Sequence, residues 1–439
     1  ADSMFNFNLS VKIYRSIVLL EKGKKYKVIL SNTAYLSVLE ILKMVMPFVA
    51  LPYLIQTVGT ENYGIVVFAQ TVISYFIVLV NFGLDVSAVK DVSVARNDLP
   101  KLNEVVSSVL LIKTILFLIS FVILGGMVLF IDKFRIHCLL FFLSFLSCLS
   151  EILFPVWFYQ GIEKMKYITL IRFISIFIYT VSVFLFIRHA DDYILIPLLQ
   201  SVGWIISGIV SFLMLLKAEN ISLFVPSSSL VKKYFVDSIP FFFSRVSVVI
   251  NNGMAKIICG IFFSMHEVAA FDLAQKIATT ALVPLQMLNQ AVFPHIAKTK
   301  DVNFVNKCFR MMMFATLGII VCVYVLAPLG VKILSGGELM DSVSILRILC
   351  LFIFSGGITL YTGSPVLVSF GFSKPFNRSV LLSTVILMLM YGILYLTNNF
   401  SIGRFALALG LAEFAIAVYR LYYCTHYKLI QFHGGFKLF

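Results

Sequence analysis

Apolar segments long enough to cross a membrane recur along almost the whole of this chain. A helix needs about 20 mostly apolar residues to cross the hydrocarbon core of a bilayer. Stretches such as "HCLLFFLSFLSCLSEIL" (137–153) and "LIRFISIFIYTVSVFLFI" (170–187) follow each other closely. The chain is 60% hydrophobic and 13% charged, whereas soluble domains have about 45–50% apolar and about 25% charged residues. The sequence therefore predicts an all-α integral membrane protein.

Twelve stretches fit the length of a membrane span. We place them near residues 31–57, 63–88, 104–130, 137–159, 168–188, 194–217, 235–262, 267–293, 305–328, 341–370, 377–397 and 402–426. The predicted organisation is an N-terminal cytoplasmic or interfacial segment (1–30), a six-helix bundle (31–217), a cytoplasmic linker (218–234), a second six-helix bundle (235–426) and a cytoplasmic tail (427–439). We expect prolines such as Pro240 and Pro284 to kink their spans.

The two halves also show a weak internal similarity. "ENYGIVVFAQTVIS" (61–74) stands at the start of the second span, and "HEVAAFDLAQKIAT" (266–279) at the start of the eighth. Parallel repeats of this kind are related by an axis along the membrane normal in some transporters. We therefore expect a pseudo-two-fold axis along the normal and a central cavity between the halves.

Positive charges orient the predicted spans. Lysine and arginine are enriched in cytoplasmic loops of membrane proteins, and here most of them fall before the first span or after even-numbered spans. The opposite side receives only Lys133, Arg135, Arg188, Lys332 and Arg404. This asymmetry predicts cytoplasmic N- and C-termini. It also accounts for the net charge of +14 without a nucleic-acid partner.

Polar and ionisable residues inside spans usually face a cavity or a partner. They gather in the first, second, seventh and eighth spans, and on each span they share one helical face. These stripes contain Glu40 and Lys43, then Gln70, Asn81 and Asp85, then Arg245, Asn252 and Lys256, and finally Asp272, Lys276, Gln286 and Gln290. A hydrophilic path lined by these four spans follows as a hypothesis.

Several of these charges also have a local interpretation. Asp272 and Lys276 stand one turn apart and can neutralise each other, and the same holds for Glu40 and Lys43. Arg245 has no carboxylate one turn away on its own helix. We assign structural roles to Lys113, Glu151 and Arg172, with their charges snorkelling to the cytoplasmic surface, and a pairing of Arg347 with Glu413 across helices stays open.

The segment "FPVWFYQGIEKMKYIT" (154–169) interrupts two apolar runs with polar residues. It resembles the pattern at the end of the fourth span in Wzx-type O-antigen flippases, polysaccharide transporters of the multidrug/oligosaccharidyl-lipid/polysaccharide (MOP) superfamily. The matching residues are Pro155, Trp157, Gln160, Gly161, Glu163 and Met165. "LPYLIQTVGTENYGIVVFAQ" (51–70) and "NFGLDVSAVKDVS" (81–93) are similar to this family too. Read physically, the segment is a cytoplasmic turn, with Trp157 at the membrane interface and Gly161 in the turn; alternatively, it packs at the inner mouth of a substrate path.

The resemblance implies a flippase of the bacterial inner membrane. Its substrate would be an undecaprenyl-diphosphate-linked oligosaccharide repeat unit, carried from the cytoplasmic to the periplasmic leaflet by alternating access. We expect the diphosphate to bind the cations Lys43, Arg245, Lys256 and Lys276. We expect the sugar path to be lined by Gln70, Asn81, Asn252, Gln286 and Gln290. Carboxylates that could couple transport to an ion gradient are Glu40, Asp85 and Asp272.

No motif points to metal, cofactor or hydrolytic chemistry. The chain has no G-x-x-x-x-G-K-[ST] loop, no H-E-x-x-H and no G-x-S-x-G. We therefore expect a transporter without metal or cofactor, a monomer whose partners are its lipid-linked substrate, membrane lipids and other polysaccharide-assembly proteins. Two alternatives stay open: a cation-coupled drug exporter of the same superfamily, and a polytopic polysaccharide polymerase or ligase, which the short external loops disfavour.

Overall fold

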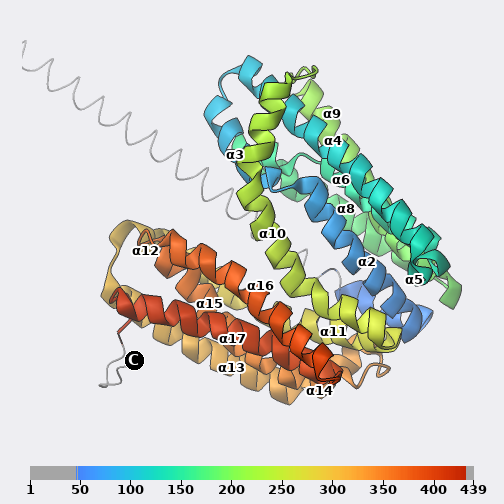
Figure 1. Cartoon of the computed structure of the whole chain (residues 1–439), viewed down its shortest axis with the longest axis vertical. Helices are drawn as coiled ribbons and strands as arrows, with labels where there is room; N and C mark the ends of the chain where they lie inside the picture. Colours follow the sequence, from blue (N-terminus) through green and yellow to red (C-terminus); the bar gives the residue numbers. More distant parts are fainter. Residues whose placement is uncertain (1–45, 47, 432–439) are drawn as a thin grey trace, which may run out of the picture.

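The computed structural model describes residue 46 and residues 48–431. Within this part of the chain the structure is helical and contains no β-strand. Figure 1 shows the helices of the first half on one side, those of the second half on the other, and the long helix α10 (Ser228–Phe262) between them. The predicted all-α class is therefore confirmed, whereas the exact twelve-helix arrangement and its pseudo-two-fold axis stay predictions.

The helices follow one another with short connections. In the first half they are α2 (Thr60–Asn81), α3 (Leu84–Ala95), α4 (Leu99–Phe130), α5 (Asp132–Ile136), α6 (Cys138–Leu153), α7 (Val156–Gly161), α8 (Met165–Phe186), η1 (Ala190–Ile194) and α9 (Leu195–Lys217). In the second half, after α10, they are α11 (Met265–Ala281), α12 (Val283–Thr299), α13 (Val302–Ser335), α14 (Ser342–Ile348), α15 (Cys350–Tyr361), η2 (Thr362–Val368), α16 (Ser373–Leu396) and α17 (Ile402–His426).

Eleven helical segments of the described residues are long and apolar enough to span a membrane. They match eleven of the twelve predicted spans to within several residues. The first predicted span, 31–57, lies mostly outside the described residues, and its described end belongs to a shorter apolar helix, Phe48–Val58. The chain is therefore a multi-pass membrane protein.

The second predicted span is not one continuous helix. It divides into α2 and α3 at Phe82 and Gly83, which both have positive φ angles (47° and 71°). Helix α10 packs into this break: the ring of Phe82 stacks against Phe235 and Phe242, with centroids 4.4 Å away in each case. A Cβ atom at Gly83 would lie 2.6 Å from Cβ of Phe241. The break thus lets α10 approach the backbone, which a sequence pattern in α2 alone does not reveal.

Three further predicted spans are also divided. The fourth, 137–159, breaks at Phe154 and Pro155, between α6 and α7. The eighth breaks between α11 and α12 at Leu282, two residues before Pro284, which occupies the first turn of α12, as expected for a residue without a backbone N–H. The tenth, 341–370, consists of α14, α15 and the π-helical η2, inside which Gly363 has non-helical dihedral angles. Pro240, in contrast, lies within the continuous α10.

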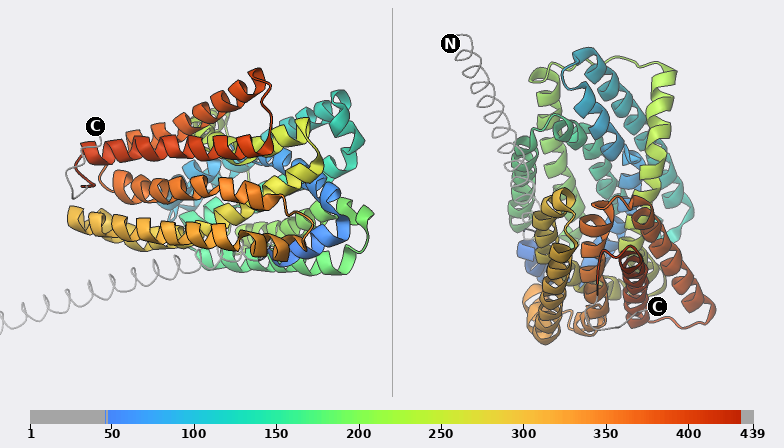
Figure 2. Two further views of the ribbon diagram at one scale, coloured as in Figure 1. Left: turned by 90° about the horizontal axis from the view of Figure 1, so that it is seen from below. Right: turned by 90° about the vertical axis from the view of Figure 1, so that its left-hand side faces the viewer.

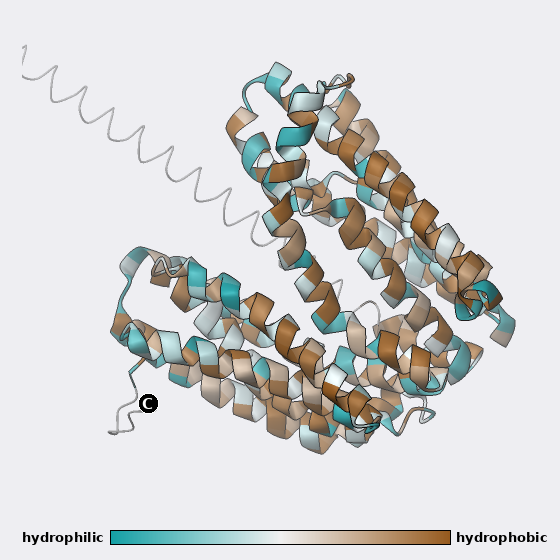
Figure 3. Cartoon of the chain, viewed as in Figure 1, coloured by the Kyte–Doolittle hydropathy of each residue, from teal (hydrophilic) through white to brown (hydrophobic). Residues whose placement is uncertain are grey.

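The outer surface suits lipid. Hydrophobic residues cover the outward faces of the long helices, whereas polar residues gather at the helix ends (Figure 3). On α4, Val122 is 72% exposed, and on α13 Phe314 is 75% exposed. Burial in acyl chains removes this apolar surface from water, so these faces need no protein partner.

The two halves meet at one end of the molecule and diverge toward the other. In Figure 1 they converge near α5, α11 and α14 and separate toward α3 and α12, and Figure 2 shows the same grouping in two turned views. The converging end carries the connections predicted to be periplasmic, such as 131–137 and 397–401. The halves therefore separate toward the end that carries the connections predicted to be cytoplasmic.

Candidate functional site

A cavity of about 440 Å³ lies in the first half, at the side of α10. We call it the Arg245 cavity. Its lining residues are Asn81, Asp85, Val86, Val89, Lys113, Glu151, Phe154, Val156, Trp157, Gln160 and Arg245. It therefore combines three residues of predicted polar stripes with two residues of the predicted family motif, although these come from four different helices.

Arg245 has a partner that its own helix does not supply. Its Nη2 donates to Oδ2 of Asp85 on α3, at 2.6 Å. The expected diphosphate is therefore not the only anion that can face Arg245, because α3 brings a carboxylate to it. Both side chains stay accessible, with 49% of Arg245 and 31% of Asp85 exposed, and a guanidinium has five N–H donors. Arg245 can thus bind a further anion from inside the cavity.

Lys113 is buried, contrary to the snorkelling role expected from the sequence. Only 1% of the residue is exposed. Its Nζ donates to Oδ1 of Asn81 (2.6 Å) and to the carbonyl of Glu151 (3.0 Å), and Nδ2 of Asn81 donates to the Glu151 carboxylate (2.8 Å). A buried lysine needs such partners because its charge is costly to remove from water. These three residues form the polar floor of the cavity.

The family motif builds one wall of the same cavity. Trp157 is 1% exposed, so it does not lie at the membrane interface as expected; it packs inward beside Gln160. Gly161 is needed for close packing and not for a turn, since a Cβ atom there would lie 2.5 Å from a methyl group of Val92 on α3. Glu163 forms an ion pair with Arg96, with 3.4 Å between Oε1 of the carboxylate and Nη1 of the guanidinium. Of the other motif residues, Pro155 precedes α7 and Met165 begins α8.

A second charged group, the Asp272 cluster, joins the two halves at their converging end. It consists of Tyr63 on α2, Lys256 on α10, and Asp272 and Lys276 on α11. Lys256 and Lys276 contact the Asp272 carboxylate at 3.1 and 2.5 Å. Tyr63 donates to Oδ2 of Asp272 at 3.0 Å and accepts from Lys276 at 2.7 Å. The local pairing of Asp272 with Lys276 is thus confirmed, but it is part of a larger link between halves.

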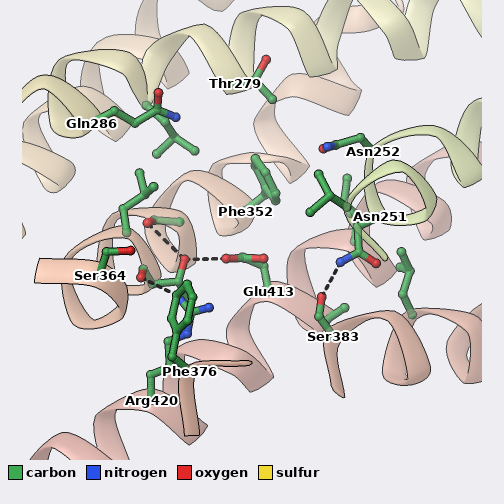
Figure 4. Close-up of a pocket in the computed structure, with 18 residues that line it drawn as sticks. Asn251, Asn252, Thr279, Gln286, Phe352, Ser364, Phe376, Ser383, Glu413 and Arg420 are labelled. Atoms are coloured by element: carbon green, nitrogen blue, oxygen red, sulfur yellow. Dashed lines mark hydrogen bonds between the residues drawn. The ribbon is translucent and has the colours of Figure 1, made fainter. Parts of the chain in front are cut away.

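A third feature is a cavity of about 520 Å³, which we call the amide cavity; it lies between α10, α11, α12, α15, η2, α16 and α17. It contains Asn252 and Gln286 from the predicted lining, together with Asn251, Thr279, Ser364 and Ser383 (Figure 4). Two ionisable residues line it that were not assigned to a site from the sequence, Glu413 and Arg420. They stand seven residues apart in the last span, and this helical spacing was the signal that could have found them.

The remaining predicted site residues lie elsewhere. Gln70 donates to Gln200 on α9 at 2.8 Å, inside the first half. Gln290 is exposed on α12 and lines neither of these cavities. Lys43 and Glu40 lie outside the described residues. Arg347 and Glu413 do not meet: Arg347 lies over the ring of Tyr324, and Glu413 accepts from Thr359.

This chain is similar to a known protein family and to individual proteins of two bacteria. Residues 29–300 match the family described as "Polysaccharide biosynthesis protein". A "Putative O-antigen transporter" of Escherichia coli K12 is 24% identical over 405 residues, covering 91% of this chain and 97% of that protein. The protein of the same name from Shigella dysenteriae is 22% identical over 346 residues, covering 78% and 87%.

Solved structures share the fold. An inward-facing multidrug resistance MATE family transporter of the MOP superfamily has a TM-score of 0.67 and 16% identity, covering 90% of this chain and 98% of its own. The lipid II flippase MurJ in an inward closed conformation has a TM-score of 0.65 and 16% identity, covering 88% and 87%. These likenesses confirm the family expected from the sequence: the chain belongs to the polysaccharide biosynthesis protein family and has the fold of MOP-superfamily transporters.

Proposed function

We propose that this protein is a flippase for undecaprenyl-diphosphate-linked oligosaccharide repeat units, located in the bacterial inner membrane with both termini in the cytoplasm. Transport rather than enzymatic chemistry agrees with relatives named as O-antigen transporters and with structural neighbours that are transporters. The substrate moves from the cytoplasmic to the periplasmic leaflet by alternating access. It needs no covalent step, because a polar path through the protein is sufficient.

The Arg245 cavity is the observation that carries this proposal. A phosphate is costly to place in hydrocarbon, and a guanidinium binds it through two parallel N–H···O bonds. Arg245 lies on the inner face of α10 with half of its side chain exposed. Asp85 orients the guanidinium, and the diphosphate uses the donors that Asp85 leaves available. The motif residues Trp157 and Gln160 shape the wall beside it.

The Asp272 cluster is the proposed gate on the periplasmic side. Opening that side requires α2 to leave α11, which breaks the contacts of Tyr63 with Asp272 and Lys276. Protonation of Asp272 would release both lysines at once, so this carboxylate is one candidate for ion coupling, although the two lysines favour its charged form. Asp85 is a second candidate, because the diphosphate competes with it for Arg245. Collapse of the proton or sodium gradient should then stop transport in vesicles; undiminished transport would remove the coupling.

A single-tryptophan titration tests the phosphate site. The chain has two tryptophans, so Trp204→Phe leaves Trp157, in the cavity wall, as the only indole. We expect undecaprenyl diphosphate to change its fluorescence in a saturable way, and undecaprenol, which lacks the diphosphate, to leave it unchanged. Arg245→Ala should abolish the response. Equal responses to both lipids would contradict the proposal, as would failure of the wild-type chain to restore surface polysaccharide in a flippase-deficient strain.

A further inference from the structure

The amide cavity carries chemistry that differs from that of the Arg245 cavity. Of the described residues that line it, only Glu413 and Arg420 are ionisable, and they have opposite charges. Arg420 is 8% exposed; it donates to the Ser379 hydroxyl (2.8 Å) and the Thr359 carbonyl (2.7 Å). The Thr359 hydroxyl in turn donates to Glu413. The charges therefore belong to one network, and the cavity offers no spare cation to a phosphate.

The rest of the polar lining consists of amides and hydroxyls. Figure 4 shows Asn252, Thr279 and Gln286 along one side of the cavity, with Glu413 and Ser364 across from them. Asn252, Gln286 and Ser364 are exposed to its interior. An amide offers donors and an acceptor together, so it can serve both roles of a hydroxyl group. Phe352 adds an aromatic surface, and nine of the eighteen lining residues are polar, which suits a ligand rich in hydroxyl groups.

One buried polar atom among the residues that line the amide cavity lacks a hydrogen-bond partner, as do ten other buried side-chain atoms elsewhere in the described structure. Nδ2 of Asn251 donates to Ser383 at 2.8 Å, but its buried Oδ1 accepts no hydrogen bond. An unmade hydrogen bond of a buried polar atom costs about 1–3 kcal/mol. A ligand hydroxyl would reach this oxygen only after the Asn251 side chain turns toward the cavity.

We propose that the amide cavity is a subsite for the uncharged sugars of the repeat unit, about 10 Å along α10 from the phosphate-binding Arg245. Asn252 follows Arg245 by seven residues, which is two turns, so both side chains share one face of α10. A substrate lying along this face places its diphosphate at Arg245 and its first sugars against Asn252 and Gln286. The cavity volume of about 520 Å³ is within the range of about 300–1,000 Å³ for small-molecule sites. This assignment rests on the proposed function. It makes the amide cavity the part of the protein that selects the glycan.

The test compares two lipids in the Trp204→Phe protein, with Trp157 as the reporter. The probes are undecaprenyl diphosphate and the lipid-linked repeat unit extracted from a flippase-deficient strain. We expect the wild type to bind the glycosylated lipid more tightly. Asn252→Ala and Gln286→Ala should each reduce that preference about five- to tenfold, as loss of one or two hydrogen bonds predicts, and leave the affinity for undecaprenyl diphosphate within twofold. Gln290→Ala, the same change one turn later on α12, should alter neither affinity.

The outcomes separate the two proposals. Arg245→Ala should lower the affinity for both lipids equally. If it lowers neither affinity, the assignment of the phosphate site is wrong. If Arg245→Ala behaves as expected but the wild type shows no preference for the glycosylated lipid, the sugar subsite is wrong on its own. The sugar subsite is also wrong if Asn252→Ala and Gln286→Ala leave the preference for the glycosylated lipid unchanged, or if they lower the affinity for both lipids alike. Melting temperatures measured in parallel identify a variant that has merely lost its fold.

Discussion

Replacing Arg245 tests whether this residue binds phosphate or only neutralises Asp85. Because both side chains are partly exposed, at 49% and 31%, the pair contributes only about 0.2–1 kcal/mol to stability. Arg245→Ala should therefore leave the amount of folded protein and its melting temperature close to the wild type. A bidentate phosphate contact contains two charge-assisted hydrogen bonds of about 1.5–3 kcal/mol each. Its loss amounts to at least about 3 kcal/mol, or roughly 150-fold in affinity for the lipid diphosphate.

Surface polysaccharide in a flippase-deficient strain is the assay, with membrane expression measured beside it. Arg245→Ala should abolish export. Arg245→Lys should keep partial export, because an ammonium supplies the charge without the planar fork of donors.

The double variant Arg245→Ala/Asp85→Asn gives the decisive comparison. If Arg245 serves only to neutralise Asp85, removal of both charges restores export. If it binds phosphate, the double variant stays inactive although it is folded, whereas Asp85→Asn alone keeps export. If Asp85→Asn alone is inactive, Asp85 acts in coupling, and the affinity of the double variant for undecaprenyl diphosphate decides instead. Restored export in the double variant, or full export by Arg245→Ala alone, would refute the phosphate assignment.

Three further predictions concern the structure around the sites. Gly64→Ala should hinder closure of the halves and destabilise the protein by about 1–3 kcal/mol, because the new Cβ atom would overlap the Met265 carbonyl. Gly125→Ala, with open space around it, is the control and should be neutral. Equal melting temperatures of the two variants would contradict this prediction. Tyr63→Phe removes two hydrogen bonds between α2 and α11, so hydrogen–deuterium exchange in the first turns of these helices should rise roughly 5- to 30-fold, and unchanged exchange would argue against a gate. Lys113→Ala leaves two buried acceptors, Oδ1 of Asn81 and the Glu151 carbonyl, without their donor and should lower the yield of folded protein through a loss of about 2–6 kcal/mol, at about 1–3 kcal/mol for each acceptor; wild-type yield would show that the lysine is not structural.

Helix existence and approximate position followed from the sequence alone. A span must contain about 20 apolar residues because lipid cannot hydrogen-bond the backbone, and this requirement is visible in any window of the chain. Eleven of the predicted spans accordingly recur as membrane-length helices. The family also followed, since the motif from Pro155 to Met165 and its flanking stretches are local patterns. Breaks such as that at Phe82 did not follow, because they depend on α10 packing against α2.

In the candidate site, too, the sequence predicted local features, whereas the tertiary structure decided which residues are partners. Helical periodicity placed Arg245, Asn252 and Lys256 on one face of their helix, because 3.6 residues per turn is a property of the local chain. Their partners come from elsewhere: Asp85 stands 160 positions from Arg245, and Tyr63 stands 209 positions from Asp272. Which helices face each other is decided by packing over the whole fold. The sequence by itself therefore determined the spans and the polar faces, and only the tertiary structure decided which charges neutralise each other and which line a cavity.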